Sequence, residues 1–170
     1  MDIHIKTHTH PTNKMSAIAH FGEYGSVVFT TRHFIIGAEV HIQLRNFDPF
    51  REYALHIHEY GDTRGGCQSL GGHWNPHNTQ HGNHLRDGSN RHAGDLLNNI
   101  TMDEHGCFDL TFVDGLVKAP EILGRSVVIH EGRDDLGRGG DAESKVSGNA
   151  GRRLLCAVIG VCGTPPPTHT

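Results

Sequence analysis

The stretch IGAEVHIQL, residues 36–44, alternates strictly between apolar side chains and small or polar ones. Side chains along a β-strand point to opposite faces in turn, so this pattern predicts a strand with one face in a hydrophobic core. The apolar face consists of Ile36, Ala38, Val40, Ile42 and Leu44.

Seven further segments of the 170-residue chain are strand-like, and no convincing helical pattern of ten or more residues occurs. Short strands separated by turn residues predict an all-β fold, an antiparallel sandwich or barrel. Glycine, with 22 residues, is close to twice as frequent as usual and favours turns. The predicted strands are 16–21, 25–31, 53–59, 94–101, 107–113, 126–130 and 153–160.

The size and charge of the chain exclude several classes of protein. Its length fits one domain, which we place at residues 16–162, after a disordered extension (1–15) and before a flexible tail (163–170). A net charge of −4 argues against a nucleic-acid partner, and no apolar run is long enough to cross a membrane. The polar first residues contain no secretory signal, so we expect a cytoplasmic protein.

Two long glycine-rich segments, residues 60–93 and 131–152, have little strand character. Loops of this length are uncommon in a compact domain unless they are functional or disordered. The chain has 16 histidines, and seven of them lie between residues 56 and 92. We therefore expect a bound metal, rather than a core of their own, to hold these loops.

The sequence His56-Ile57-His58 is the first candidate metal-binding motif. Residues two apart on a strand share a face, so both imidazoles could reach one ion while Tyr53, Leu55 and Ile57 face the core. An isolated H-x-H motif is weak evidence. The alternative interpretation is a pair of exposed strand histidines.

A second cluster combines three imidazoles with one carboxylate over 23 residues. That donor set suits a closed tetrahedral zinc site, and the alternative is a polar loop without metal. His130, at the end of a predicted strand, could add a ligand from the sheet. The cluster consists of His73, His81, His92 and Asp95.

The four cysteines contain no CxxC motif, which excludes a thiolate zinc ribbon and a thioredoxin-type motif. A Cys67–Cys156 disulfide is one of the pairings that spacing allows. Four reduced thiols are the default for a chain without a secretory signal. The remaining two cysteines are Cys107 and Cys162.

Six separated motifs then follow one another in a fixed order: HIHEYGD (56–62), GHWNP (72–76) with HG (81–82), RHAGDL (91–96), VIHE (128–131), DDLG (134–137) with GG (139–140), and GNAGRRLLCAVIG (148–160). Together they resemble the signatures of the copper/zinc superoxide dismutase family, from about residue 16 to residue 162. Six motifs in the right order are highly specific. The resemblance implies an eight-stranded antiparallel Greek-key sandwich or barrel with two long functional loops, in agreement with the strand pattern.

The resemblance also implies one copper and one zinc ion per subunit, with a histidine shared between them. The implied copper ligands are His56, His58, His73 and His130. The implied zinc ligands are His73, His81, His92 and Asp95. Asp134 resembles the carboxylate that hydrogen-bonds His56 and His81, Arg153 resembles the arginine beside copper, and Cys67 and Cys156 resemble the intrasubunit disulfide.

The implied reaction is the conversion of superoxide to oxygen and hydrogen peroxide, with copper alternately reduced and reoxidised. Arg153 would hold the anion, and His73 would take up a proton when its bond to copper opens. The family also implies a homodimer, with contacts near residues 60–64, 123–124 and 158–162, and leaves room for a copper chaperone as a partner. The alternatives are a dismutase-like module that stores or delivers metal without turnover, and a structural protein held by zinc alone. Neither requires a complete copper set with Arg153.

The chain departs from the common animal form of the family in its loops. It has two extra residues between His81 and His92. Lys145 stands one position before the usual steering lysine, whose place is taken by Val146, and Ala142 replaces a usual acid. We expect the cations of the second loop to attract superoxide despite the negative net charge. They are Arg133, Arg138, Lys145, Arg152 and Arg153.

Overall fold

The computed structural model describes residues 14–163. Most of the predicted N-terminal extension and C-terminal tail therefore lies outside the described residues. Within them, Met15 is the first residue of a strand and pairs with Thr31. None of the helices in this part of the chain is long and apolar enough to span a membrane.

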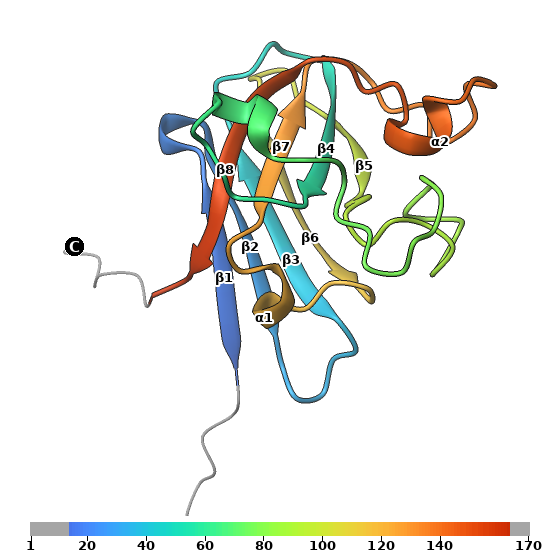
Figure 1. The fold of residues 1–170 in the computed structure, drawn as a ribbon. Coiled ribbons are helices and arrows are strands. Elements are labelled where there is room, and N and C mark those ends of the chain that lie inside the picture. Colours follow the sequence, from blue (N-terminus) through green and yellow to red (C-terminus); the bar gives the residue numbers. More distant parts are fainter. Residues whose placement is uncertain (1–13, 164–170) are drawn as a thin grey trace, which may run out of the picture.

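Eight antiparallel strands form a nearly closed barrel in the order β5-β4-β7-β8-β1-β2-β3-β6 (Figure 1). This confirms the predicted fold class. In this order β1 pairs with β8, so the first and the last strand are neighbours in the middle of the sheet. The strands are β1 (Met15–His20), β2 (Gly25–Thr31), β3 (Ala38–Leu44), β4 (Glu52–His58), β5 (Asn98–Thr101), β6 (Phe108–Asp114), β7 (Ser126–His130) and β8 (Arg153–Val161).

The stretch at residues 36–44 forms β3, which begins two residues later than predicted. Gly37 has a φ of 89°, and a Cβ there would collide with the carbonyl oxygen of Asp114. The chain therefore turns at this glycine before it enters the sheet. From Ala38 onward the alternating apolar side chains are buried, as the pattern predicted.

The predicted strand at residues 94–101 is wrong in its first half. Leu97 and Asn98 have φ values of 54° and 61°, in the left-handed region that interrupts an extended strand. The main chain of Gly94 instead pairs with Ile57 and Trp74. Only Asn98–Thr101 forms β5, at the edge of the sheet.

The hydrophobic core fills the barrel, and the strands contribute to it the side chains that point inward. Leu55 and Ile57 of β4 are fully buried in it, as are Val127 and Ile129 of β7. Because side chains alternate along a strand, the intervening residues of β4 and β7 point away from the core. His56, His58 and their neighbours are therefore presented on the opposite face of the same two strands.

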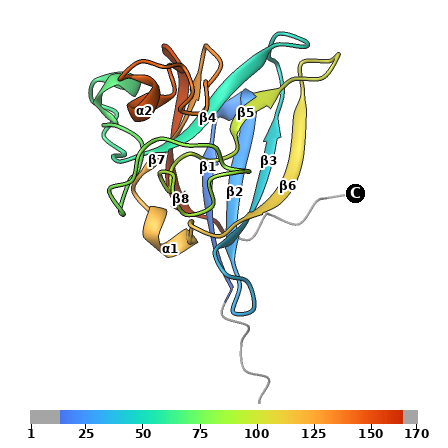
Figure 2. The ribbon, with the colours of Figure 1, turned by 90° about the vertical axis from the view of Figure 1, so that its right-hand side faces the viewer.

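Two long loops cover that face, on the side of β4, β5 and β7 (Figure 1). The first follows β4 and contains a short 3-10 helix, η2 (Gly66–Ser69); the second connects β7 to β8 and contains α2 (Ser144–Ser147). Figure 2, turned toward this side, shows both loops in front of the sheet. The other short helices are η1 (Gly22–Tyr24) and α1 (Ala119–Ile122).

A disulfide joins Cys67, in η2, to Cys156, in β8. This confirms the pairing that the family resemblance implied, and it excludes the alternative of four reduced thiols. Cys107 and Cys162 are free. The bridge fastens the start of the first loop to the sheet near the histidine-bearing face.

Candidate metal centre

Two adjacent strands provide most of the first histidine group. His56 and His58 are alternate residues of β4, and His130 ends β7, which pairs with β4. His73 comes from the first loop and reaches the group because it forms a β-bridge with His58. One ligand atom from each of these four buried residues lies within 4.8 Å of the others.

Hydrogen bonds to main-chain carbonyls fix the orientation of two of these rings. His58 donates from Nδ1 to Gly71 (3.0 Å), and His130 donates from Nδ1 to Gly151 (3.1 Å). A carbonyl oxygen can only accept, so both Nδ1 atoms carry hydrogen. Burial lowers the pKa of His58 far below its usual range and that of His130 to about 4, so both rings are neutral at pH 7.

The two Nε2 atoms that remain face each other at 3.2 Å. In neutral rings with hydrogen on Nδ1, both Nε2 atoms carry lone pairs and cannot hydrogen-bond to one another. Two buried lone pairs directed at one point are the arrangement that a metal cation requires. The ring geometry of His58 and His130 therefore fits a bound metal.

Two further nitrogens point the same way. His56 Nδ1 and His73 Nε2 are buried and have no hydrogen-bond partner among the described residues. Burial lowers the pKa of His56 to about 3, so its ring is neutral, and its Nε2 hydrogen-bonds to Asp134 (2.7 Å). A buried polar atom without a partner is costly, and a metal ion satisfies both nitrogens.

The second group gathers around one carboxylate oxygen. Oδ1 of Asp95 lies 2.9 Å from Nδ1 of His73, 2.8 Å from Nδ1 of His81 and 3.2 Å from Nδ1 of His92. Oδ2 accepts from the main-chain N–H groups of Gly82 and His92, which fixes the carboxylate. Three imidazole nitrogens and one oxygen form the donor set of a closed zinc site.

Charges in the second group also favour a cation. Burial alone would raise the pKa of Asp95, but the hydrogen bonds from His73 and His81 and the nearby imidazole of His92 outweigh it and keep the carboxyl ionised. Burial alone would likewise lower the pKa of His81, yet its bonds to Asp134 and Asp95 raise that pKa to about 9. Without metal, a proton therefore occupies a position that a zinc ion can take.

Two residues connect the groups. His73 belongs to both, because its Nδ1 is hydrogen-bonded to Asp95 and its unpartnered Nε2 faces the first group. Asp134 accepts from His56 through Oδ2 (2.7 Å) and lies 2.8 Å from Nε2 of His81 through Oδ1. The two sites are thus coupled directly by an imidazole and indirectly by a carboxylate.

Arg153, at the start of β8, is held by the first loop. It donates from Nη1 to the carbonyl oxygens of Cys67 (2.7 Å) and Gln68 (3.4 Å), and from Nη2 to that of Gly71. No carboxylate in residues 14–163 forms a salt bridge with it. Partial burial lowers its pKa, but a guanidinium remains charged at neutral pH. Arg153 is therefore not part of a structural ion pair within the described residues.

The other cations of the second loop are mostly engaged. Arg133 pairs with Glu52 and Arg152 pairs with Glu131, each at 3.0 Å. Lys145 donates to the carbonyl oxygen of Gly137. The expected attraction of superoxide by these side chains stays a prediction, and the carboxylate partners of Arg133 and Arg152 reduce the contribution of these two cations.

Sequence reasoning missed several residues that shape the centre. The carbonyls of Gly71 and Gly151 orient two rings, and backbone atoms leave no signal in a sequence. Asn98 and Asn99 of β5 hydrogen-bond to Asp134. Arg91 also forms a buried pair with Asp114 through two bonds of 2.9 Å, and only its place in the RHAGDL motif could have indicated it.

A β-barrel with a buried copper-type histidine set, joined by one imidazole to a zinc-type set, defines a class of two-metal proteins. The family model described as copper/zinc superoxide dismutase matches residues 23–159. The chain belongs to this family. Its activity is that of a copper- and zinc-dependent oxidoreductase, a superoxide dismutase.

Curated relatives agree along most of the chain. A superoxide dismutase [Cu-Zn] of Neurospora crassa is 44% identical over 140 residues, which cover 81% of this chain and 89% of the relative. A relative of the same name from Podospora anserina has the same identity and coverage. The solved structure titled "Crystal Structure Analysis of the clock protein EA4" superimposes with a TM-score of 0.79 at 37% identity, over 91% of this chain and 99% of that one.

Proposed function

We propose that the chain converts two superoxide ions and two protons to oxygen and hydrogen peroxide at the centre described above. The observation that carries this proposal is the pair of donor groups sharing His73, with buried lone pairs directed into the first group and an ionised carboxylate, Asp95, at the centre of the second. The copper set would be His56, His58, His73 and His130. The zinc set would be His73, His81, His92 and Asp95.

Bound copper would supply a one-electron couple, and bound zinc, which has no redox chemistry, would order the shared imidazole and the loop. Arg153 would hold the diatomic anion, because its guanidinium is a fixed cation at the edge of the histidine group. The guanidinium lies beside this group, because Arg153 and His58 donate to the same carbonyl oxygen, that of Gly71.

The chain would also supply one of the two protons that peroxide formation needs, and the other would come from solvent. Nε2 of His73 is buried and unpartnered, so it can hold a proton whenever it is not bound to metal. Its Nδ1 would stay fixed in the zinc set, so the ring would keep its place. A second superoxide at Arg153 could then receive that proton.

Metal analysis combined with a superoxide-consumption assay tests this proposal. We expect one copper and one zinc per chain and cyanide-sensitive activity. His58→Gln should lose copper and His81→Gln should lose zinc. The matched control is His77→Gln, because His77 is an exposed histidine of the same loop and belongs to neither group. Stoichiometric metals without activity would contradict the proposal and favour a metal-storage module.

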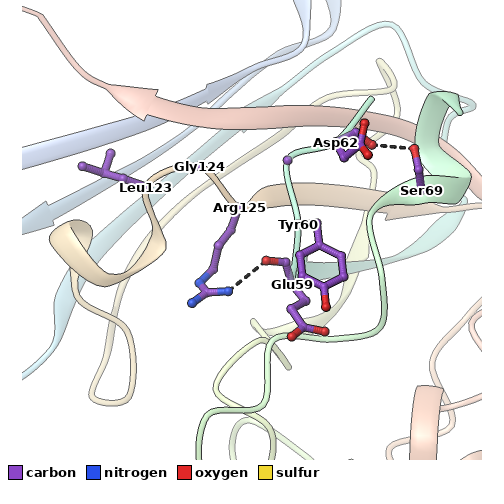
Figure 3. Close-up of a pocket in the computed structure, with 8 residues that line it drawn as sticks. Glu59, Tyr60, Asp62, Ser69, Leu123, Gly124 and Arg125 are labelled. Atoms are coloured by element: carbon purple, nitrogen blue, oxygen red, sulfur yellow. Dashed lines mark hydrogen bonds between the residues drawn. The ribbon is translucent and has the colours of Figure 1, made fainter. Parts of the chain in front are cut away.

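We further propose that the chain forms a homodimer through β8 and the groove beside it. Figure 3 shows the groove, with Glu59–Asp62 on one wall and Leu123–Arg125 on the other. Arg125 donates to the carbonyl oxygen of Glu59 (2.8 Å) and stacks over Trp74, which joins the walls. Tyr60 lines the groove, Val158 of β8 lies next to Gly61 in its wall, and both side chains are exposed; Leu154 and Val161 are the other exposed apolar side chains of β8.

Contiguous exposed apolar side chains are typical of a surface that another chain covers. Sedimentation velocity should give a dimer mass, and Val158→Glu should give a monomer. The control is Val113→Glu, a somewhat more exposed valine on β6 at the far edge of the sheet. A monomer in the unaltered protein would contradict the proposal. The cytoplasmic location and the copper chaperone stay predictions from the sequence.

A further inference from the structure

Asn99, on the edge strand β5, forms a reciprocal pair of hydrogen bonds with the main chain of Asp134. Its side-chain Nδ2 donates to the carbonyl oxygen of Asp134 (2.9 Å), and its Oδ1 accepts from the N–H of Asp134 (2.8 Å). The amide thus imitates a neighbouring strand for a single residue of the second loop. It satisfies both main-chain polar groups of that residue.

The preceding residue holds the other end of Asp134. Asn98, which is buried, donates from Nδ2 to Oδ2 of the carboxylate (2.9 Å) and to the carbonyl oxygen of Gly82 (2.9 Å). Its Oδ1 accepts from the main-chain N–H of His84 (2.7 Å). Two consecutive asparagines therefore fix Asp134, one through its main chain and one through its carboxylate, and tie it to the first loop.

The position of Asp134 matters for both metal groups. Its two carboxylate oxygens contact His56 and His81, which belong to different groups. A displacement of its main chain by a few tenths of an ångström would lengthen one of these two hydrogen bonds and shorten the other. Residues that contact ligand-bearing side chains commonly set the orientation and basicity of those ligands.

We propose that Asn99 is a positioning residue that sets how the Asp134 carboxylate is divided between the two metal sites. The inference rests on the ligand sets proposed above. Asn99 touches neither metal ligands nor substrate, and it acts through the main chain of Asp134. The same strand therefore contributes to the metal centre without contributing a ligand.

The test compares three variants by zinc affinity, measured in competition with a chelator, and by the visible spectrum of cobalt(II) placed in the zinc site. Asn99→Val keeps the approximate volume but removes both hydrogen bonds. Asn99→Ser keeps a hydroxyl that can make one of them. Gln43→Val is the control. Gln43 lies on the exposed face of β3, and its side-chain amide donates a hydrogen bond to Asp109 of β6, which the substitution removes.

We expect Asn99→Val to weaken zinc binding about tenfold, at the lower end of what such residues contribute. The cobalt bands should shift, because the ring of His81 reorients. Asn99→Ser should lie between Asn99→Val and the unaltered protein, and Gln43→Val should match the unaltered protein. A merely structural role would lower the unfolding temperature without moving the cobalt spectrum of the folded protein.

The inference is overturned if Asn99→Val retains both the zinc affinity and the cobalt spectrum of the unaltered protein while His81→Ala loses zinc in the same titration. Retention of zinc by His81→Ala would instead overturn the proposed zinc set, and this inference with it. The two failures are therefore distinguishable in one experiment.

Discussion

Arg153 donates a hydrogen bond of 2.7 Å to the carbonyl oxygen of Cys67, which is itself bound through its sulfur to Cys156. Cys156 lies three residues after Arg153 on the same strand. The disulfide and the hydrogen bond therefore close a small ring of contacts between η2 and β8. The Cys67–Cys156 disulfide thus holds in place the carbonyl group that fixes Arg153, the residue that would bind the substrate.

The first prediction concerns that link. Replacing both Cys67 and Cys156 by serine should lower the free energy of unfolding by about 4–5 kcal/mol, because the bridge closes a loop of about 90 residues in the unfolded chain. Activity per bound copper should also fall, since the carbonyl of Cys67 is released. Urea unfolding and the assay measure the two effects. Full activity per copper would show that the bridge does not position Arg153.

A second prediction separates charge from shape at Arg153. Arg153→Lys keeps a cation but offers its donors from a single nitrogen, which cannot replace Nη1 and Nη2 at the carbonyl groups of Cys67 and Gly71, and Arg153→Gln removes the charge. Both should keep copper and zinc, and Arg153→Gln should lower kcat/KM by at least about tenfold at low ionic strength. Arg138→Gln, which removes an exposed cation of the second loop, is the comparison. If Arg153→Gln and Arg138→Gln lowered kcat/KM equally, Arg153 would act only by general electrostatic attraction of superoxide.

The third prediction uses two glycines with similar backbone conformation. Gly148 has a φ of 65°, and a Cβ there would collide with the carboxylate of Asp134 and the ring of His81. Gly88 has a φ of 55° and open space around it. Gly148→Ala should therefore lose zinc affinity and about 1–3 kcal/mol of stability beyond the strain common to both variants. Equal effects in Gly88→Ala would assign the whole loss to backbone strain.

The fourth prediction concerns proton release. The raised pKa of His81, about 9, means that the metal-free protein holds a proton there at neutral pH, which stabilises the fold below pH 6.5 and ceases to do so as pH rises through 9. Zinc must displace this proton, so zinc affinity should rise with pH between about 6.5 and 9. Calorimetry in buffers of different ionisation enthalpy measures the release.

The copper set should behave differently over the same range. The pKa values of His56 and His130 are lowered to about 3 and about 4, so these rings already lack the competing proton at pH 5. Copper binding to zinc-loaded protein should therefore release little proton from these two rings between pH 5 and pH 8. His73 would release one proton per copper, because a ring bound to zinc through Nδ1 carries its hydrogen on Nε2. A second proton released per copper over that interval would contradict the assignments of His56 and His130.

The barrel was predictable because its strands alternate. The pattern of β3 depends only on which side chains enter the core, and a sequence records that directly. The start of β5 was not predictable, because Leu97 adopts a left-handed backbone that glycine or asparagine usually adopts. Nothing in the side chain of a leucine indicates it.

The metal centre was predictable to a different degree. The spacing of the histidines indicated two candidate clusters, but the sharing of His73 between them and the place of His130 in the copper set came from the family resemblance. The roles of the Gly71 and Gly151 carbonyls could not be predicted, because every residue has a carbonyl group. The charges of Arg133 and Arg152 were visible, whereas their partners depend on how the two loops fold together.

The carbonyl oxygen of Gly71 accepts from both Nδ1 of His58 and Nη2 of Arg153. An oxygen polarised by a guanidinium attracts the Nδ1 proton of His58 less strongly, which leaves less electron density on the opposite ring nitrogen. A weaker imidazole donor stabilises Cu(I) relative to Cu(II) and raises the reduction potential of the copper. The carbonyl oxygen of Gly71 would thus connect Arg153, which would bind superoxide, to the reduction potential of the copper that would oxidise superoxide.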